Sequence, residues 1–142
     1  MPVTFRFDIV LRVRDAERDR CRVRLAQEQT SQTELCAERE RVAAEREQVL
    51  QVLTQLQSRD QWSAQIALAL HQQAELLEVE LLRIEDDLQR AFATVARCLK
   101  ELTEANTAVQ GLEKLAGRHQ ADQLRLELKA AERDREDTWR VA

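Results

Sequence analysis

The feature that most constrains this chain is a run of more than one hundred residues, between Pro2 and Gly111, that contains neither glycine nor proline. These two residues are the ones that end helices and build turns. Alanine, leucine, glutamate, glutamine and arginine dominate the run, and all of them favour the helix. We therefore expect an all-α fold of one or two very long helices, whose surface rather than an enclosed cavity carries the function.

The charge balance excludes several kinds of partner. Charged residues make up 34% of the 142 residues, yet the net charge is only −4, which is too small to imply nucleic-acid binding or adhesion to a membrane. No apolar run approaches the roughly 18 residues of a membrane-spanning helix, and the N-terminus lacks the apolar segment of a signal peptide. We expect a cytosolic chain with no nucleic-acid partner and no direct membrane span.

Motifs for catalysis and metal binding are missing from the sequence. The three cysteines form no CxxC pair, His71 and His119 lie far apart, and there is no HExxH, P-loop or GxSxG pattern. We expect the protein not to be an enzyme and to have no catalytic, metal or cofactor site. The cysteines are interpreted as reduced, small hydrophobic residues on helices.

Each half of the chain contains a series of residues spaced alternately by three and four positions, as in coiled coils. In the first half the track is Cys21, Leu25, Glu28, Gln32, Leu35, Arg39, Val42, Arg46, Val49, Leu53 and Leu56. The second half is richer in apolar residues: Ile66, Leu70, Leu77, Leu81, Ile84, Leu88, Phe92, Val95, Leu99, Leu102, Val109 and Leu112. The step from Leu88 to Phe92 predicts a stutter, which would locally unwind the supercoil.

The two tracks are separated by the segment 58–63, which predicts a turn. Ser58, Asp60 and Ser63 are all good N-cap residues. We predict one coiled-coil domain over 1–142, a long antiparallel two-helix coiled-coil hairpin. Its first helix covers about 8–57, with Asp8 as a plausible N-cap, and the turn covers about 58–62. The second helix covers about 62–137.

A turn near residue 60 implies that facing residues have numbers that add to about 120. Phe7 would then lie near Leu112 or Leu115, and Arg39, Arg41 and Arg46 would meet the acidic stretch 75–87. The second helix is longer, so its last ~25 residues would have no partner. Gly111 and Gly117 would let this end bend or fray.

The two ends of the chain contain the candidate binding residues. Seven arginines lie between Arg6 and Arg24, among four acidic residues; they form either a solvated helix face or a basic surface for an acidic partner. Phe5 and Phe7 stand at the start, Trp62 at the turn and Trp139 near the end. Packing is the expected role of Phe7, and partner binding that of Trp139.

The start of the chain resembles a known family. Phe5-Arg6-Phe7, followed by Val10-Leu11-Arg12-Val13-Arg14 and then a charged helix with Leu25-Ala26, is similar to the N-terminus of the flagellar export protein FliJ family. The chain length and the two helices with an ill-marked turn also fit. One departure lies at Lys129-Ala130-Ala131-Glu132-Arg133, where members often have a large apolar residue and two acids after the lysine.

This resemblance implies a non-enzymatic, coiled-coil stalk of the flagellar type III protein export apparatus. Such a protein binds the hexameric export ATPase, promotes its assembly and activity, and contacts the export gate membrane protein and export chaperones. It is cytoplasmic and peripheral at the cytoplasmic face of the inner membrane, and it serves flagellum biogenesis and motility. The resemblance implies an ATPase-facing set of Phe5, Phe7, Leu11, Arg12 and Arg14, and a gate-facing set in the middle of the hairpin.

Two alternatives remain at the level of sequence. The equivalent stalk protein of an injectisome would have the same mechanism. A generic scaffold would instead be one straight helix, about 200 Å long, that forms a parallel dimeric rod. The missing turn glycine favours the rod, whereas the charge pairing and the N-terminal motif favour the hairpin.

Overall fold

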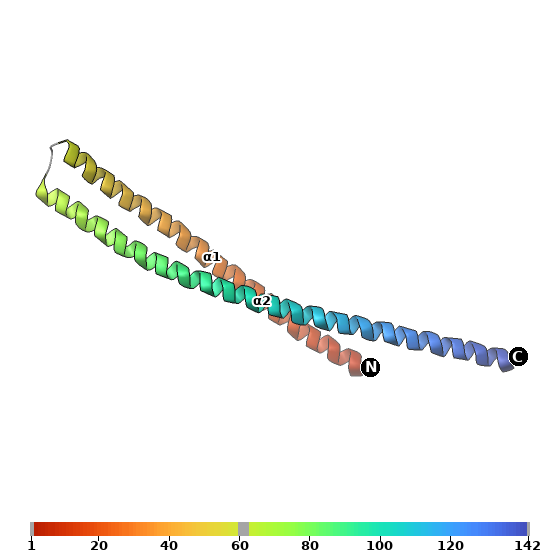
Figure 1. The fold of residues 1–142 in the computed structure, drawn as a ribbon. Coiled ribbons are helices and arrows are strands. Elements are labelled where there is room, and N and C mark those ends of the chain that lie inside the picture. The colour runs from red at the N-terminus through yellow and green to blue at the C-terminus, as the bar shows by residue number, and fades with distance from the viewer. Residues whose placement is uncertain (1, 60–62, 142) are drawn as a thin grey trace. The chain divides into compact units, whose positions relative to one another are not determined.

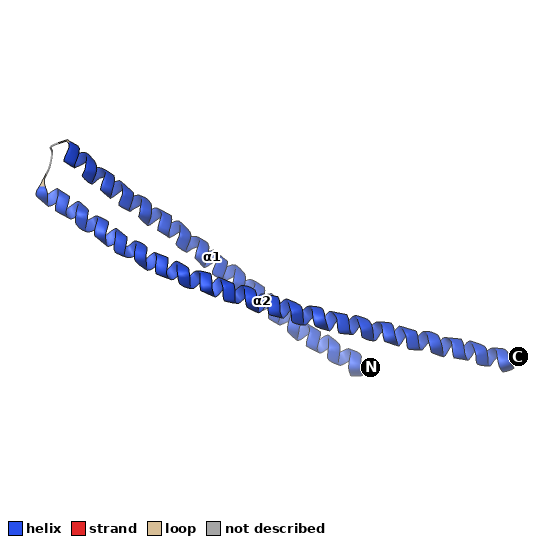
Figure 2. Ribbon diagram, viewed as in Figure 1, coloured by secondary structure: helices blue, strands red, loops and turns tan. Residues whose placement is uncertain are grey.

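The computed structural model of the protein describes residues 2–59 and 63–141, with side chains from residue 6 onward. It contains two helices, α1 (Pro2–Ser58) and α2 (Ala64–Val141), and no strand among the described residues (Figures 1 and 2). The helices pack against each other and the chain folds back between them, so the predicted all-α helical hairpin is confirmed. The alternative of one straight helix that forms a parallel dimeric rod does not fit this fold.

α1 begins earlier than the sequence predicted and both helices end later, whereas α2 begins at Ala64, after the predicted start at about 62. α1 begins at Pro2, where proline is favoured because its fixed φ suits the first turn and its missing N–H would have no partner there. Asp8 therefore lies inside α1, and its prediction as an N-cap is wrong. Ser63 directly precedes α2, and its carbonyl accepts a 3.0 Å hydrogen bond from the Ala67 N–H, as expected for an N-cap. Asp60 lies outside the described residues.

The chain divides into two compact units. The hairpin unit is Val23–Leu99, and the terminal unit combines Met1–Arg22 with Lys100–Ala142. Each unit thus contains part of α1 and part of α2. Since a helix of this composition cannot bury an apolar stripe alone, each unit depends on packing between its two helical segments.

The core of the hairpin unit is a single seam between the two helices. Its buried residues are Leu25, Val42, Leu53, Ala67, Ala74, Leu77, Ile84, Leu88 and Cys98. On each helix these positions belong to an alternating series of three- and four-residue steps, as in a coiled coil. Val42, Leu77, Ile84 and Leu88 form one cluster, onto which Leu35, Cys36, Val49 and Leu81 pack. The heptad prediction for α1 is therefore confirmed at its apolar positions.

The seam of α2 takes a different path from the one predicted. Phe92 is 54% exposed and Ile66 is 50% exposed, whereas Ala91 is half-buried and Cys98 is buried. The seam runs through Leu88, Ala91, Val95 and Cys98 in regular steps of three, four and three. The predicted stutter is therefore wrong. The prediction followed the large side chain of Phe92, whereas the small side chains of Ala91 and Cys98 occupy the seam.

Ion pairs between the helices define the register of the hairpin unit. Arg39 lies 3.2 Å from Glu85, and Arg46 lies 3.9 Å from Glu78. The residue numbers of each pair add to 124, about one helical turn from the predicted 120. The pairing of Arg39 and Arg46 with the acidic stretch is confirmed. Arg41 instead pairs with Glu45 on its own helix at 3.1 Å.

Neither glycine interrupts α2. The helix runs through Gly111 and Gly117 to Val141 (Figure 1), and both glycines have open space around them. The helix is therefore continuous at both glycines. A glycine in a helix costs only about 1 kcal/mol relative to alanine, which the surrounding helix-forming residues outweigh.

Two isoleucines of α2 provide a direct test of the seam. Ile84 is 1% exposed, whereas Ile66 is 50% exposed. We expect Ile84→Ala to lower the free energy of unfolding by about 2–5 kcal/mol because it leaves a cavity in the core, and Ile66→Ala to change it by about 0.5 kcal/mol or less. Urea unfolding followed by circular dichroism at 222 nm measures both. Equal losses would contradict the seam described here.

Candidate partner-binding surfaces

Phe7 and Leu11 lie on the side of α1 that packs within the terminal unit. Both are half-buried, and the Phe7 ring lies 6.0 Å from the His119 ring at an interplanar angle of 36°. The expected packing role of Phe7 is confirmed, but its contact lies beyond the predicted Leu112 and Leu115. This difference follows the shift in register seen in the hairpin unit.

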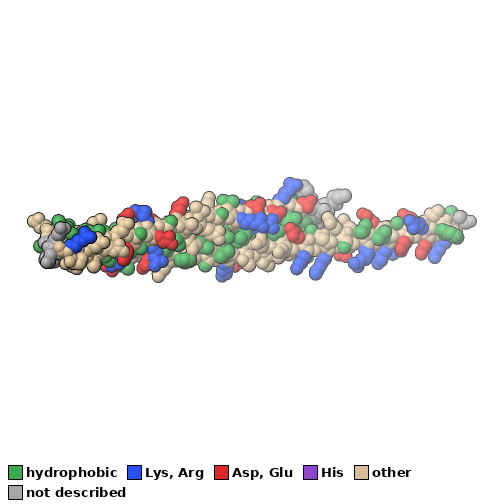
Figure 3. All heavy atoms as spheres, turned by 90° about the horizontal axis from the view of Figure 1, so that it is seen from above, with side chains coloured by type: hydrophobic (Ala, Val, Ile, Leu, Met, Phe, Trp, Pro, Cys, Tyr) green, Lys and Arg blue, Asp and Glu red, His purple; other side chains and the backbone are tan. Residues whose placement is uncertain are grey.

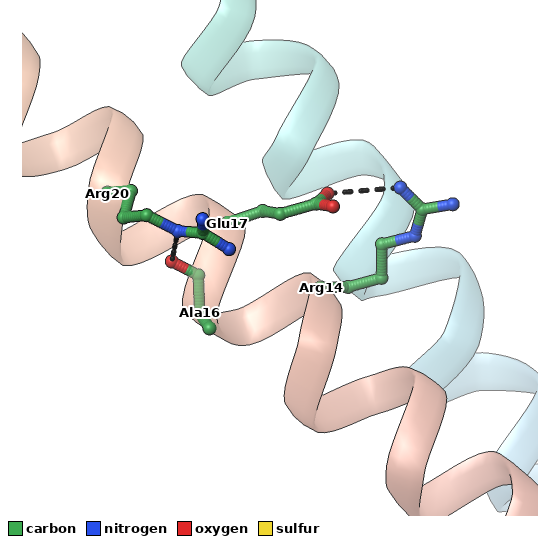
Figure 4. A network of polar contacts seen from close by, with 4 residues as sticks. All are labelled: Arg14, Ala16, Glu17 and Arg20. Atoms are coloured by element: carbon green, nitrogen blue, oxygen red, sulfur yellow. Dashed lines mark hydrogen bonds and ion pairs between the residues drawn. The ribbon is translucent and has the colours of Figure 1, made fainter.

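The remaining residues of the predicted ATPase-facing set have other surroundings. Arg12 is exposed and makes no ion pair with the described residues. Arg14 is also exposed, and its guanidinium lies 3.0 Å from the Glu17 carboxylate (Figure 4). The side chain of Phe5 lies outside the described residues. The structure thus separates this set into half-buried apolar residues and exposed arginines.

Three ion pairs within α1 neutralise most of the acids in its N-terminal part. They join Arg14 to Glu17, Arg18 to Asp15 and Arg22 to Asp19, at 3.0, 3.0 and 3.7 Å. Such pairs on a helix contribute only about 0.2–0.5 kcal/mol each. Their larger effect is on the charge that this part of α1 displays. The pairs neutralise three acids and three arginines, whereas Arg6, Arg12 and Arg20 make no ion pair with the described residues. Figure 4 shows Arg20 turned back, with its Nε–H donating to the Ala16 carbonyl at 3.4 Å.

A shallow groove of about 460 Å³ lies between the two helical segments of the terminal unit. Its lining residues are Arg14, Glu17, Arg20, Cys21, Glu101, Glu104, Ala105 and Ala108. The groove exists because Cys21, Ala105 and Ala108 are too small to fill the space between the helices. Its rim carries both signs of charge, which suits contact with polar side chains. Sequence analysis missed it, although the closely spaced small residues were a usable signal.

The C-terminal segment of α2, residues 120–141, is not buried by any other part of the chain that the structure describes. Every residue in it is exposed, including Leu124, Leu126, Leu128 and Trp139, the last at 85%. An unpartnered C-terminal segment was predicted from the unequal helix lengths. Trp139 is therefore available to a partner, whereas Trp62, predicted as a contact at the turn, lies outside the described residues.

A second apolar stripe lies on the outer face of α2 in the hairpin unit. Leu68, Leu76, Val79 and Leu82 are 60%, 71%, 64% and 61% exposed. With 3.6 residues per turn they point away from the seam formed by Ala67, Ala74 and Leu77. Sequence analysis missed this stripe, because it searched for one apolar face and these residues form a second. We call these four residues the outer stripe.

The described residues offer no site for a metal ion. Over residues 2–59 and 63–141 no three histidine, cysteine or acidic side chains gather closely enough to hold one, and all three cysteines are free. On the face seen in Figure 3, acidic and basic side chains are interspersed. Within the described residues, neither helix has a stretch that combines the length and apolarity needed to cross a bilayer.

Comparison with known proteins gives no relative: no family model, no curated protein and no solved structure matches the chain.

The exposure of the C-terminal segment predicts a large difference in backbone protection along the chain. Because isolated helices of this length are marginal in water, amides in 120–141 should exchange with deuterium about a hundredfold or more faster than those in 77–88. Hydrogen–deuterium exchange with mass spectrometry measures this ratio. As a control, a chain truncated after His119 should keep its urea midpoint. Similar protection in both segments of a monomer would contradict the prediction.

Proposed function

We propose that this chain is a coiled-coil stalk of the flagellar type III protein export apparatus. In this role it binds the hexameric export ATPase, promotes assembly and activity of the ATPase ring, and links the ring to the export gate membrane protein and to export chaperones. It acts in the cytoplasm and at the cytoplasmic face of the inner membrane. It performs no chemistry of its own.

The observation that carries this proposal is the N-terminal motif in its structural setting. Phe5-Arg6-Phe7 and Val10-Leu11-Arg12-Val13-Arg14, on which the resemblance to the FliJ family depends, occupy the start of α1 in a helical hairpin. The stalk that this resemblance implies is an antiparallel helical coiled coil, a description that the helical hairpin fits. The exposed arginines Arg12 and Arg14 and the unpartnered end of α2 both belong to the terminal unit, which makes it the part we assign to the ATPase.

Packing in the terminal unit is thin, which is consistent with a segment that is completed by a partner. Val109 is its buried hydrophobic residue, whereas the other buried residues belong to the hairpin unit. A partner that binds only the folded chain stabilises it by mass action, by about 2.7 kcal/mol at a concentration one hundred times the dissociation constant. We therefore expect the chain alone to melt at low temperature and to melt higher with the ATPase. A high melting temperature unaffected by the ATPase would contradict the proposal.

Charge reversal of the two exposed arginines tests the assigned contact. Arg12→Glu with Arg14→Glu should weaken binding to the purified export ATPase about tenfold or more, the equivalent of about 1.4 kcal/mol, and added salt should weaken wild-type binding. Isothermal titration calorimetry gives both constants. Arg90→Glu with Arg97→Glu, an exposed pair in the hairpin unit, is the matched control. No binding by the wild type, or equal effects of the two pairs, would count against the proposal.

A further inference from the structure

The side chains along the α2 seam repeat at intervals of seven residues. The small residues recur one heptad later in two series, which are Ala67 and Ala74 in the first, and Ala91, Cys98 and Ala105 in the second. The large residues do the same, as Leu81 and Leu88 in the first series and as Leu70, Leu77 and Ile84 in the second. A seam with this repeat presents similar side chains to α1 when one helix is displaced by one heptad along the other.

The polar residues of the α1 seam do not single out one register either. Gln32, Arg39 and Arg46 occupy successive positions of one heptad series. A single polar residue on a seam can fix the register, but three residues at seven-residue intervals meet equivalent positions before and after a displacement of one heptad. The packing of half-buried Leu56 is conserved in the same way, since it lies opposite Ala67 now and would lie opposite Ala74 after the displacement.

The ion pairs between the helices also allow a second register. Arg39 pairs with Glu85 and Arg46 with Glu78, and the two arginines, like the two glutamates, are seven residues apart. If the numbers of the paired residues added to 131 instead of 124, Arg46 would face Glu85. One ion pair would therefore remain where there are now two. Exposed pairs of this kind contribute little to stability, so the loss of one leaves the two registers close in free energy.

The two ends of α2 would change in opposite ways on such a displacement. Residues 64–67, the first turn of α2, would join the connection to α1, and the buried side chain in this turn is the small one of Ala67. In the terminal unit, Leu126 would take the place that His119 now has beside Phe7, because it lies seven residues further along α2. Leu126 is now 67% exposed. Its burial against Phe7 would offset the exposure of Ala67.

We propose that the two helices exchange between two registers that differ by one heptad. In the second register α2 is displaced along α1 by about 10 Å, as packed helices do in larger switching proteins in steps of one turn. The displacement changes which residues of α2 pack on the N-terminal part of α1. A partner that binds one register more tightly would shift the two populations by the ratio of its two affinities. This exchange does not depend on the export function proposed above.

Two spin labels would measure the register directly. The labels are attached at Glu47→Cys and Ala96→Cys, two exposed positions of the hairpin unit outside the seam, in the full chain with its three native cysteines replaced by alanine. The second register brings the labelled positions about 10 Å closer along the helix axes. Double electron–electron resonance should therefore show two distances that differ by roughly this amount. A single distance, both in this chain and in the ion-pair variant below, would overturn the proposal.

Two double variants test the role of the ion pairs. Arg39→Gln with Glu78→Gln leaves Arg46 and Glu85, which face each other only in the second register. Arg39→Gln with Glu85→Gln leaves Arg46 and Glu78, which pair in the present register, and is the matched control with the same net charge. The first variant should have a ratio of shorter-distance to longer-distance population about threefold or more above that of the control. Equal ratios in the two variants would overturn the proposal.

The contact that the second register gains provides an independent test. Leu126→Ser should lower the shorter-distance population about threefold or more, since Leu126 is buried against Phe7 only in that register. Leu128→Ser is the matched control. Leu128 is also exposed, at 59%, and it lies about 200° around the helix from Leu126, away from α1 in both registers. Equal effects of the two substitutions would overturn the second register as described.

Discussion

The seam between α1 and α2 is the packing on which the fold depends. All ten buried hydrophobic residues among the described ones belong to its alternating three- and four-residue series. A two-helix protein has one line of contact, so each polar residue on that line removes apolar burial. At Arg46 the half-buried stem lies along the seam while the guanidinium reaches Glu78, as amphipathic side chains do. Arginine is thereby tolerated on the seam, with electrostatic attraction that favours one register over others.

The hairpin could be predicted from sequence because its signals are long and redundant. A heptad series repeated over many turns and a run without glycine or proline both indicate long helices, and complementary charges indicated the register to within one turn. The finer errors have a common cause. Ala67, Ala74, Ala91 and Cys98 form much of the α2 seam, but small side chains contribute little to an apolar pattern. Phe92 gave a stronger apolar signal than these small residues, but its side chain is exposed.

The candidate surfaces were less predictable, since exposure depends on which apolar face is chosen for the core. Over 66–82, α2 has apolar residues on two faces, and a helix that is apolar all round is normally buried. Sequence alone does not decide which face packs on α1. Once the seam is assigned to Ala67, Ala74 and Leu77, the outer stripe follows from the helical repeat. The partner of Phe7 was missed for a related reason, because His119 is polar and gave no packing signal.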